Sequence, residues 1–274
     1  MHVLLAPLVA GVGAGRPCLI VYHIGKAGGE SIHAWVVRAG LKLWTHYDRG
    51  DDEIFARPSD RPKGTRQLVH DADVIMGHFT PASDRRGRFV DALRRRNFTR
   101  RCAEWTILRD PLDLQASMLA YLYGRHPDVW NDCLAAPTLD GDGPCTHRTQ
   151  YRRHPMLRDC LCHTFDGQMD HWNTYNFKAT HSTGPWPPPC RYESAQRALE
   201  ALDGVGFTES MNESVIQPWV RHLGLSDRAP PYEATHATRS NRGFDALSTQ
   251  IQRTIAETSR DDILLYRWAR RRRA

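Results

Sequence analysis

A short apolar segment that runs into a glycine loop constrains this chain most. Residues 19–24 are rich in β-branched and aromatic side chains, which predicts a buried strand. The strand ends at Gly25, the loop continues through Gly28 and Gly29, and a helical pattern then begins. Glycines let a backbone approach a ligand closely, and the first N–H groups of a helix attract negative charge. The segment therefore predicts either an anion-binding loop, with Lys26 as a cation beside it, or an ordinary strand-to-helix turn.

Further apolar segments alternate with helical patterns along the chain. The other predicted strands are 72–76, 105–108 and 205–207, with a further extended piece at 41–47. The predicted helices are 32–39, 111–123, 192–202, 209–223, 247–255 and 263–268. This alternation predicts an α/β fold with a parallel sheet between helices, in which ligands bind at the carboxyl ends of the strands. Lys26, His78 and Arg109 each follow such an end, so we expect them to meet.

The composition is that of a globular protein with a basic surface. Of the 274 residues, 41% are hydrophobic and 25% are charged, and the net charge is +6. This length fits one large α/β domain or two small ones. The positive charge favours an anionic partner, either a nucleotide, a charged glycan or nucleic acid, and the alternative is a basic surface without a partner. The basic run 84–101 and the terminal Arg270–Arg273 are interpreted as a solvated helix and a solvated tail, or as guides for an anionic glycan.

Seven cysteines are present, and five of them lie in residues 133–190, a segment also rich in Pro and Gly. The clustering predicts loops joined by disulfides in an oxidising compartment, and the alternative is a reduced chain with buried thiols. Pairing of Cys190 with Cys160 or Cys162 is expected, and pairing of Cys18 with Cys102 is possible because both precede strands.

The chain divides into an apolar lead-in, 1–17, and a single domain, 18–274, with a loop-rich insertion at about 124–190. The lead-in is too short to span a bilayer and is interpreted as a truncated signal or anchor, or as a simple lead-in. Sequons at Asn97 and Asn212 are compatible with a glycoprotein of the secretory route.

The glycine loop is not a Walker A loop, and two motifs of the chain match another kind of phosphate site. A Walker A loop needs Gly-Lys-Ser/Thr after its glycines, whereas Lys26 precedes Gly28 and Gly29 here. His23-Ile-Gly-Lys-Ala-Gly-Gly-Glu-Ser-Ile32 instead resembles the 5′-phosphosulfate loop of carbohydrate sulfotransferases of the heparan-sulfate 2-O and 6-O type. Thr106-Ile-Leu-Arg-Asp-Pro111, followed by Ser117, resembles their 3′-phosphate motif. Gly77-His78-Phe79 and Val205-Gly-Phe-Thr-Glu209 are similar to further segments of that family.

The resemblance implies a sulfotransferase that uses 3′-phosphoadenosine 5′-phosphosulfate (PAPS) and no metal. It implies a P-loop-NTPase-like parallel sheet flanked by helices, with a cysteine-rich irregular insertion in which Cys133 and Cys145 would pair. The expected acceptor is a hydroxyl of a glycan, with no nucleic-acid partner. The expected location is the Golgi lumen, and membrane association through a missing or truncated N-terminal anchor stays open.

The resemblance also assigns roles to residues. Lys26 would stabilise the leaving group, and His78 would take the proton from the acceptor hydroxyl. Arg109 and Ser117 would hold the 3′-phosphate. The 5′-phosphate would be bound by Lys26 and by the loop residues Ala27, Gly28, Gly29, Glu30 and Ser31.

Two other functions stay open. Glu30 and Leu114 replace residues usual in this family, which motivates a nucleotide- or glycan-binding protein on the same fold with weakened catalysis. A small kinase is the third candidate, and the absence of Gly-Lys-Ser/Thr argues against it. For His78 and Arg109, the structural alternatives are a core histidine and a helix start capped by Asp110.

Overall fold

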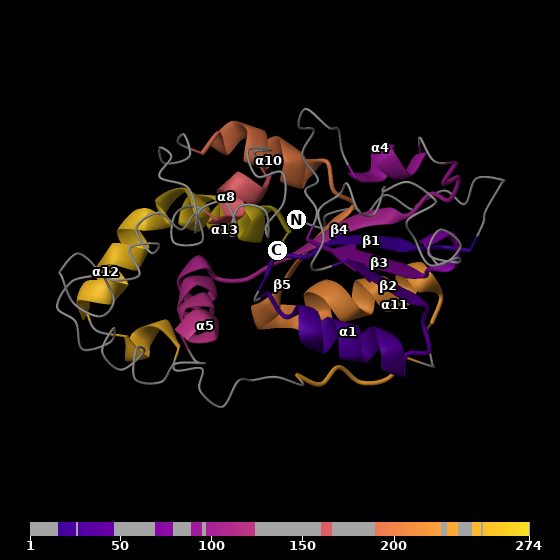
Figure 1. The fold of residues 1–274 in the computed structure, drawn as a ribbon, viewed down its shortest axis with the longest axis horizontal. Helices are drawn as coiled ribbons and strands as arrows, with labels where there is room; N and C mark the ends of the chain where they lie inside the picture. The colour runs from indigo at the N-terminus through magenta and orange to yellow at the C-terminus, as the bar shows by residue number, and fades with distance from the viewer. Residues whose placement is uncertain are drawn as a thin grey trace.

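A five-stranded, all-parallel sheet lies at the centre of the molecule (Figure 1). The computed structural model describes residues 16–25, 27–46, 69–78, 89–94, 97–123, 160–165, 190–225, 229–234, 243–247 and 249–273. The strands are β1 Leu19–Tyr22, β2 Leu43–His46, β3 Val74–Gly77, β4 Ala103–Leu108 and β5 Gly204–Phe207, in the order β2-β3-β1-β4-β5. The α/β prediction is confirmed. Lys26, Cys133, Cys145 and most of the segment 124–190 lie outside the described residues.

Helices cover both faces of the sheet (Figure 1). They are α1 Gly29–Arg38, α4 Phe89–Arg94, α5 Pro111–Tyr123, α8 Cys160–Phe165, α10 Tyr192–Glu200, α11 Gln217–Leu223, α12 Thr249–Thr258 and α13 Arg260–Arg273. Shorter turns are the 3-10 turns Thr208–Ser210 and Phe244–Ala246 and the π turn Asn212–Ile216. Side chains of β1 alternate between the two faces, so Leu19 and Val21 pack against α1 and α11, whereas Ile20 and Tyr22 face α4, α8, α10 and α13.

Local sequence explains these elements. Strands β1, β3 and β5 are buried along their whole length, as expected for parallel strands covered on both faces. In α1, Ile32, Trp35 and Val36 recur at helical spacing and are fully buried. The helix ends before Gly40, whose φ of 68° is left-handed, as is common just after a helix.

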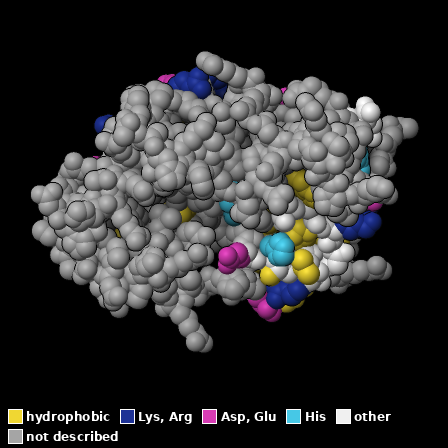
Figure 2. Space-filling view, in the orientation of Figure 1, with side chains coloured by type: hydrophobic (Ala, Val, Ile, Leu, Met, Phe, Trp, Pro, Cys, Tyr) yellow, Lys and Arg dark blue, Asp and Glu magenta, His cyan; other side chains and the backbone are white. Residues whose placement is uncertain are grey.

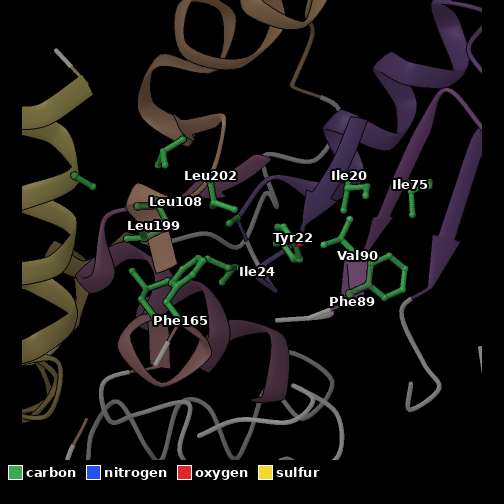
Figure 3. Close-up of a cluster of buried hydrophobic side chains, with 14 of the residues drawn as sticks. Ile20, Tyr22, Ile24, Ile75, Phe89, Val90, Leu108, Phe165, Leu199 and Leu202 are labelled. Atoms are coloured by element: carbon green, nitrogen blue, oxygen red, sulfur yellow. The ribbon is translucent and has the colours of Figure 1, made fainter. Parts of the chain in front are cut away.

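The larger of the two hydrophobic clusters lies on the face of the sheet that α10 and α13 cover (Figure 3). Ile20, Tyr22 and Ile24 from β1 and the loop after it point into it, together with Leu108 of β4 and Phe165 of α8. Residues distant in sequence therefore pack together around the carboxyl end of β1.

The chain leaves neighbouring strands toward opposite faces. After β1 it enters α1, whereas after β3 and β4 it leads to Phe89 of α4 and Leu114 of α5, which belong to the other half of the core. Such a reversal opens a crevice at the carboxyl ends of the strands, which is where ligands bind in open α/β sheets. Here the reversal lies at β1, between β3 and β4.

The amino ends of the strands are cross-linked. A disulfide joins Cys18, just before β1, to Cys102, just before β4, with Cα atoms 4.5 Å apart. The guanidinium of Arg100 donates to the carbonyls of His70 and Ala72, at 2.8 and 2.5 Å, and to that of Arg16 at 3.0 Å. The pairing of Cys18 with Cys102 that the sequence left open is present.

A second disulfide and a buried carboxylate fix α8. Cys162 pairs with Cys190, which selects one of the two expected partners. Asp262 of α13 is fully buried, and its two oxygens accept the N–H groups of Leu161 and Cys162 at 2.9 and 2.7 Å. Helix α8 was expected to be irregular. It forms because these long-range contacts, which the local sequence does not display, satisfy its first turn.

Asp262→Ala is expected to destabilise the protein by about 3 kcal/mol, because it leaves two buried N–H donors without an acceptor. Urea unfolding measures the loss. The control is Asp245→Ala, since Asp245 is exposed, and it is expected to change stability by less than about 0.5 kcal/mol. Equal unfolding midpoints for the two variants would contradict the capping role.

One expectation near the C-terminus is corrected. Arg270–Arg273 was interpreted as a solvated tail; Arg270, Arg271 and Arg272 are exposed, as expected, but they belong to α13, which continues through Arg273. Residues 229–234 lie against α1, where the indole N–H of Trp35 donates to the carbonyl of Pro230 at 2.9 Å. In the described part of the chain, no helix is long and apolar enough to cross a membrane.

Candidate active site

The carboxyl ends of β3, β1 and β4 lie side by side. Tyr22, the last residue of β1, is in register with Gly77 of β3 and Thr106 of β4. The N–H of His23 donates to the carbonyl of Gly77 at 2.8 Å, and the Thr106 hydroxyl donates to the carbonyl of Tyr22 at 2.8 Å. The residues that follow these three strands therefore share one edge, as expected for the predicted motifs.

Two histidines stack at this edge. The rings of His23 and His78 are 5.0 Å apart between centroids and nearly parallel, at 18°. His23 also lies against the first turn of α1, since a Cβ built on Gly29 would stand 2.0 Å from its Nε2. Gly29 is therefore required by the packing of His23. His78 is half-buried and belongs to a pair of imidazoles, of which the sequence interpretation assigned a role only to His78.

The start of α1 has no capping side chain. The cap residue is Gly28, whose φ of 77° is left-handed, so it supplies no side-chain acceptor to the N–H groups of the first turn. Ala27 is buried, whereas Glu30 is exposed. An anion at this end of α1 would meet backbone donors and the positive end of the helix dipole.

Ser31, expected to contact a phosphate, has a protein partner. Its side chain shares a hydrogen bond with that of Tyr232, and burial raises the pKa of Tyr232. Arg38, on the same helix, forms an ion pair with Glu233 and donates to the carbonyl of Pro231 at 3.2 Å. On the face shown in Figure 2, histidine, acidic, basic and hydrophobic side chains lie together over α1. Tyr232 is thus a residue at this edge that the sequence did not indicate.

Arg109 lies where β4 passes into α5. The cap of α5 is Asp110, whose carboxylate accepts the N–H of Leu112 at 2.9 Å, so the structural reading of this turn is correct. The N–H of Asp110 donates to Glu209 Oε1 at 2.8 Å. Arg109 itself is half-buried and directly precedes this fixed turn. Capping by Asp110 and a role of Arg109 in binding are compatible, since the cap uses the Asp110 carboxylate and not the Arg109 guanidinium.

The other two α5 positions differ in environment. Ser117 is only 3% exposed, in the second turn of α5. Leu114, which replaces a residue usual in the resembled family, is 1% exposed and packs into the core beside the sheet. Leu114 is therefore a core residue in this structure. Gln115 is equally buried, and neither atom of its amide has a hydrogen-bond partner among the described residues.

Glu209 links this edge to the last helix. Its Oε2 accepts the hydroxyl of Tyr266 in α13 at 2.8 Å, and its Oε1 accepts that of Thr208 at 3.0 Å. Burial, together with the hydrogen bond to and the charge of Glu209, raises the pKa of Tyr266, so its hydroxyl stays protonated and donates. Neither Glu209 nor Tyr266 was assigned a role from the sequence. Glu209 was noted only as part of the segment Val205–Glu209, which is similar to a segment of the resembled family.

The groups at this edge, an imidazole pair, a guanidinium and a helix start, are of the kinds that bind anions and transfer protons. In the described ranges, no group of three or more His, Cys, Asp or Glu side chains is placed to hold a metal ion. A cavity of about 260 Å³ lies elsewhere, lined by Leu199, Glu200, Val205, Trp268, Ala269 and Arg272. We place the candidate site at the strand ends, because the cavity is mostly apolar and its Glu200 and Arg272 already form an ion pair.

No protein-family model matches this chain, and no curated protein matches it at a significant level. The candidate site therefore depends on its own geometry and on the motifs described above.

Proposed function

We propose that this protein is a carbohydrate O-sulfotransferase that takes its sulfuryl group from PAPS. The observation that carries the proposal is the convergence of His78, Arg109 and the uncapped start of α1 around the end of β1. These three features belong to separate motifs that resemble the same family, and the sheet brings them to one edge. The strand order supports a P-loop-like form of the fold.

The donor needs two anion sites, and we assign both to this edge. The start of α1 and Lys26 would take the 5′-phosphosulfate, with Gly28–Ser31 supplying backbone donors. The N–H of Ala27 is not one of them, because it donates to the carbonyl of Ile24 at 3.1 Å. Arg109, whose planar fork matches phosphate oxygens, would take the 3′-phosphate with Ser117. A 3′,5′-bisphosphate nucleotide fits this pair of sites better than a triphosphate, which needs a single continuous cradle.

The transfer would be a direct in-line displacement. The acceptor hydroxyl oxygen attacks the sulfur while His78 removes its proton. The bond from sulfur to the bridging oxygen breaks, and its electron pair stays on the 5′-phosphate, where Lys26 would stabilise the new charge. The products are a sulfate ester and 3′-phosphoadenosine 5′-phosphate, and the proton on His78 is then released to water.

The expected acceptor is a glycan, and the expected location is the lumen of the Golgi. Two disulfides accord with an oxidising compartment. The sequon residues Asn97 and Asn212 are both exposed, as glycosylation requires.

Calorimetry with 3′-phosphoadenosine 5′-phosphate tests the donor site. Arg109→Ala is expected to weaken binding about 10- to 100-fold, because a charge-assisted hydrogen bond contributes about 1.5–3 kcal/mol. The control is Arg253→Ala, since Arg253 is exposed on α12, a helix that lies away from the strands (Figure 1).

Three outcomes discriminate among the functions. Binding together with sulfate transfer to a glycan panel supports the proposal. Binding without transfer to any glycan favours the weakened binding protein, for which the occupied Ser31 is the motivating contact. Binding of ATP that depends on magnesium, without affinity for the bisphosphate, would favour a kinase and overturn the proposal.

A further inference from the structure

Four residues after β5 contact both of the loops expected to bind phosphate. We call this segment, Thr208–Met211, the bracket. Glu209 accepts the N–H of Asp110 at 2.8 Å, at the joint between β4 and α5. On the other side, a Cβ built on Gly28 would stand 2.7 Å from Met211 Cε and 3.5 Å from Thr208 Cγ2. The loop after β1 and the loop after β4 therefore rest on the same short segment.

A residue of α13, Tyr266, fixes the position of the bracket through a hydrogen bond to Glu209. Glu209 is exposed, yet both of its oxygens accept hydrogen bonds, Oε1 from Asp110 and Oε2 from Tyr266. The Tyr266 ring is 8% exposed and packs edge-on against Phe207, with centroids 5.6 Å apart at 88°. The guanidinium of Arg270 lies over the same Phe207 ring, 5.0 Å from its centroid. A carboxylate held at both oxygens has one orientation, and a packed tyrosine fixes it.

We propose that Tyr266 and Glu209 are positioning residues that orient Arg109 toward the 3′-phosphate of the donor. The inference rests on the proposed function. Arg109 directly precedes the N–H that Glu209 holds, so the direction of its side chain depends on that backbone joint. Recognition of a phosphate by a guanidinium fork requires placement within about 0.5 Å. Releasing Glu209 from Tyr266 lets the joint move and weakens donor binding.

A double-mutant cycle tests this link by calorimetry with 3′-phosphoadenosine 5′-phosphate. Tyr266→Phe is expected to weaken binding about fivefold, consistent with one hydrogen bond at a partly exposed site. Tyr192→Phe is the matched control, since the Tyr192 hydroxyl also forms one side-chain hydrogen bond, which it accepts from Gln196 on α10. Glu209→Ala is expected to weaken binding at least as much as Tyr266→Phe. Glu209→Gln keeps a hydrogen-bond acceptor and is expected to weaken binding less than Glu209→Ala.

The diagnostic result is non-additivity. If Tyr266 acts through Glu209, Tyr266→Phe costs no further affinity in the Glu209→Ala background. Fully additive losses, or a loss in Tyr266→Phe no larger than in Tyr192→Phe, would overturn the proposal. A residue that only stabilises the fold would lower the melting temperature without this dependence on Glu209.

Amide hydrogen exchange of the ligand-free protein separates this inference from the proposed function. Tyr266→Phe is expected to speed exchange at Asp110 about fivefold relative to Tyr192→Phe, with β1 unchanged. If the wild type binds no bisphosphate, the proposed function fails, while exchange at Asp110 still decides whether Tyr266 holds the joint. Equal exchange at Asp110 in the two variants overturns the positioning role whatever the ligand.

Discussion

His78→Ala is expected to lower the rate of sulfuryl transfer about 1,000-fold, within the range that a positioned general base contributes. The imidazole is half-buried at the end of β3 and stacks on His23, so its orientation is defined before any acceptor arrives. Because His78 would act on the acceptor proton, the KM for the donor is expected to change less than about twofold. Initial rates with labelled PAPS over a range of acceptor concentrations measure both.

Two controls separate chemistry from structure in this experiment. His33→Ala removes an exposed histidine from α1 and is expected to leave the rate unchanged. Added imidazole is expected to restore part of the rate to His78→Ala, which a folding defect would not permit. If His78→Ala keeps more than about a tenth of the wild-type rate, the assignment of the base is wrong.

Removing the Cys18–Cys102 disulfide is expected to have the largest effect on stability. The bond closes a loop with a sequence separation of 84 residues. In the chain-entropy view, a cross-link of that span stabilises the folded state by about 4.5 kcal/mol. The double variant Cys18→Ala/Cys102→Ala should lose about that amount of stability in urea unfolding. Below its unfolding midpoint it should still form the candidate site at the strand ends.

The second disulfide is the natural comparison. Cys162 and Cys190 are separated by 28 residues, so Cys162→Ala/Cys190→Ala should lose about 3.6 kcal/mol, less than the first pair. Reductant should lower the stability of the wild type and have a smaller effect on either double variant. An unfolding midpoint of Cys18→Ala/Cys102→Ala equal to that of the wild type would contradict the role given to the longer cross-link.

Much of the fold could be predicted from the sequence because the parallel strands are short, apolar and closely bounded. Residues 19–24, 72–76, 105–108 and 205–207 each contain or overlap a strand, and Pro111 marks the start of α5 as expected. The order of the strands could not be predicted, since pairing depends on contacts between distant segments. For the same reason α8 was missed, because its first turn depends on Asp262, about a hundred residues away.

The candidate site was predicted in its position but not in its detail. Strand ends showed where His78 and Arg109 would lie, because chemistry at the carboxyl edge of a parallel sheet follows from topology. The partners of those residues come from elsewhere in the chain. His23 reaches His78 only through strand pairing, and Glu209 meets Asp110 and Tyr266 only once β5 and α13 are in place. From the sequence, Gly28 and Gly29 were interpreted only as residues that leave space for a ligand. The structure gives another reason for glycine at these positions, because a side chain there would collide with Met211 or His23.

The link between Cys18 and Cys102 also changes what a backbone cut would do to this molecule. The bond turns the chain from β1 to the start of β4 into a covalent ring that contains β2 and β3. A protease cut at any single peptide bond within that ring leaves one covalently continuous molecule, separable only after reduction. In an oxidising environment, the strands on either side of β1 therefore stay attached to it even when the polypeptide between them is broken.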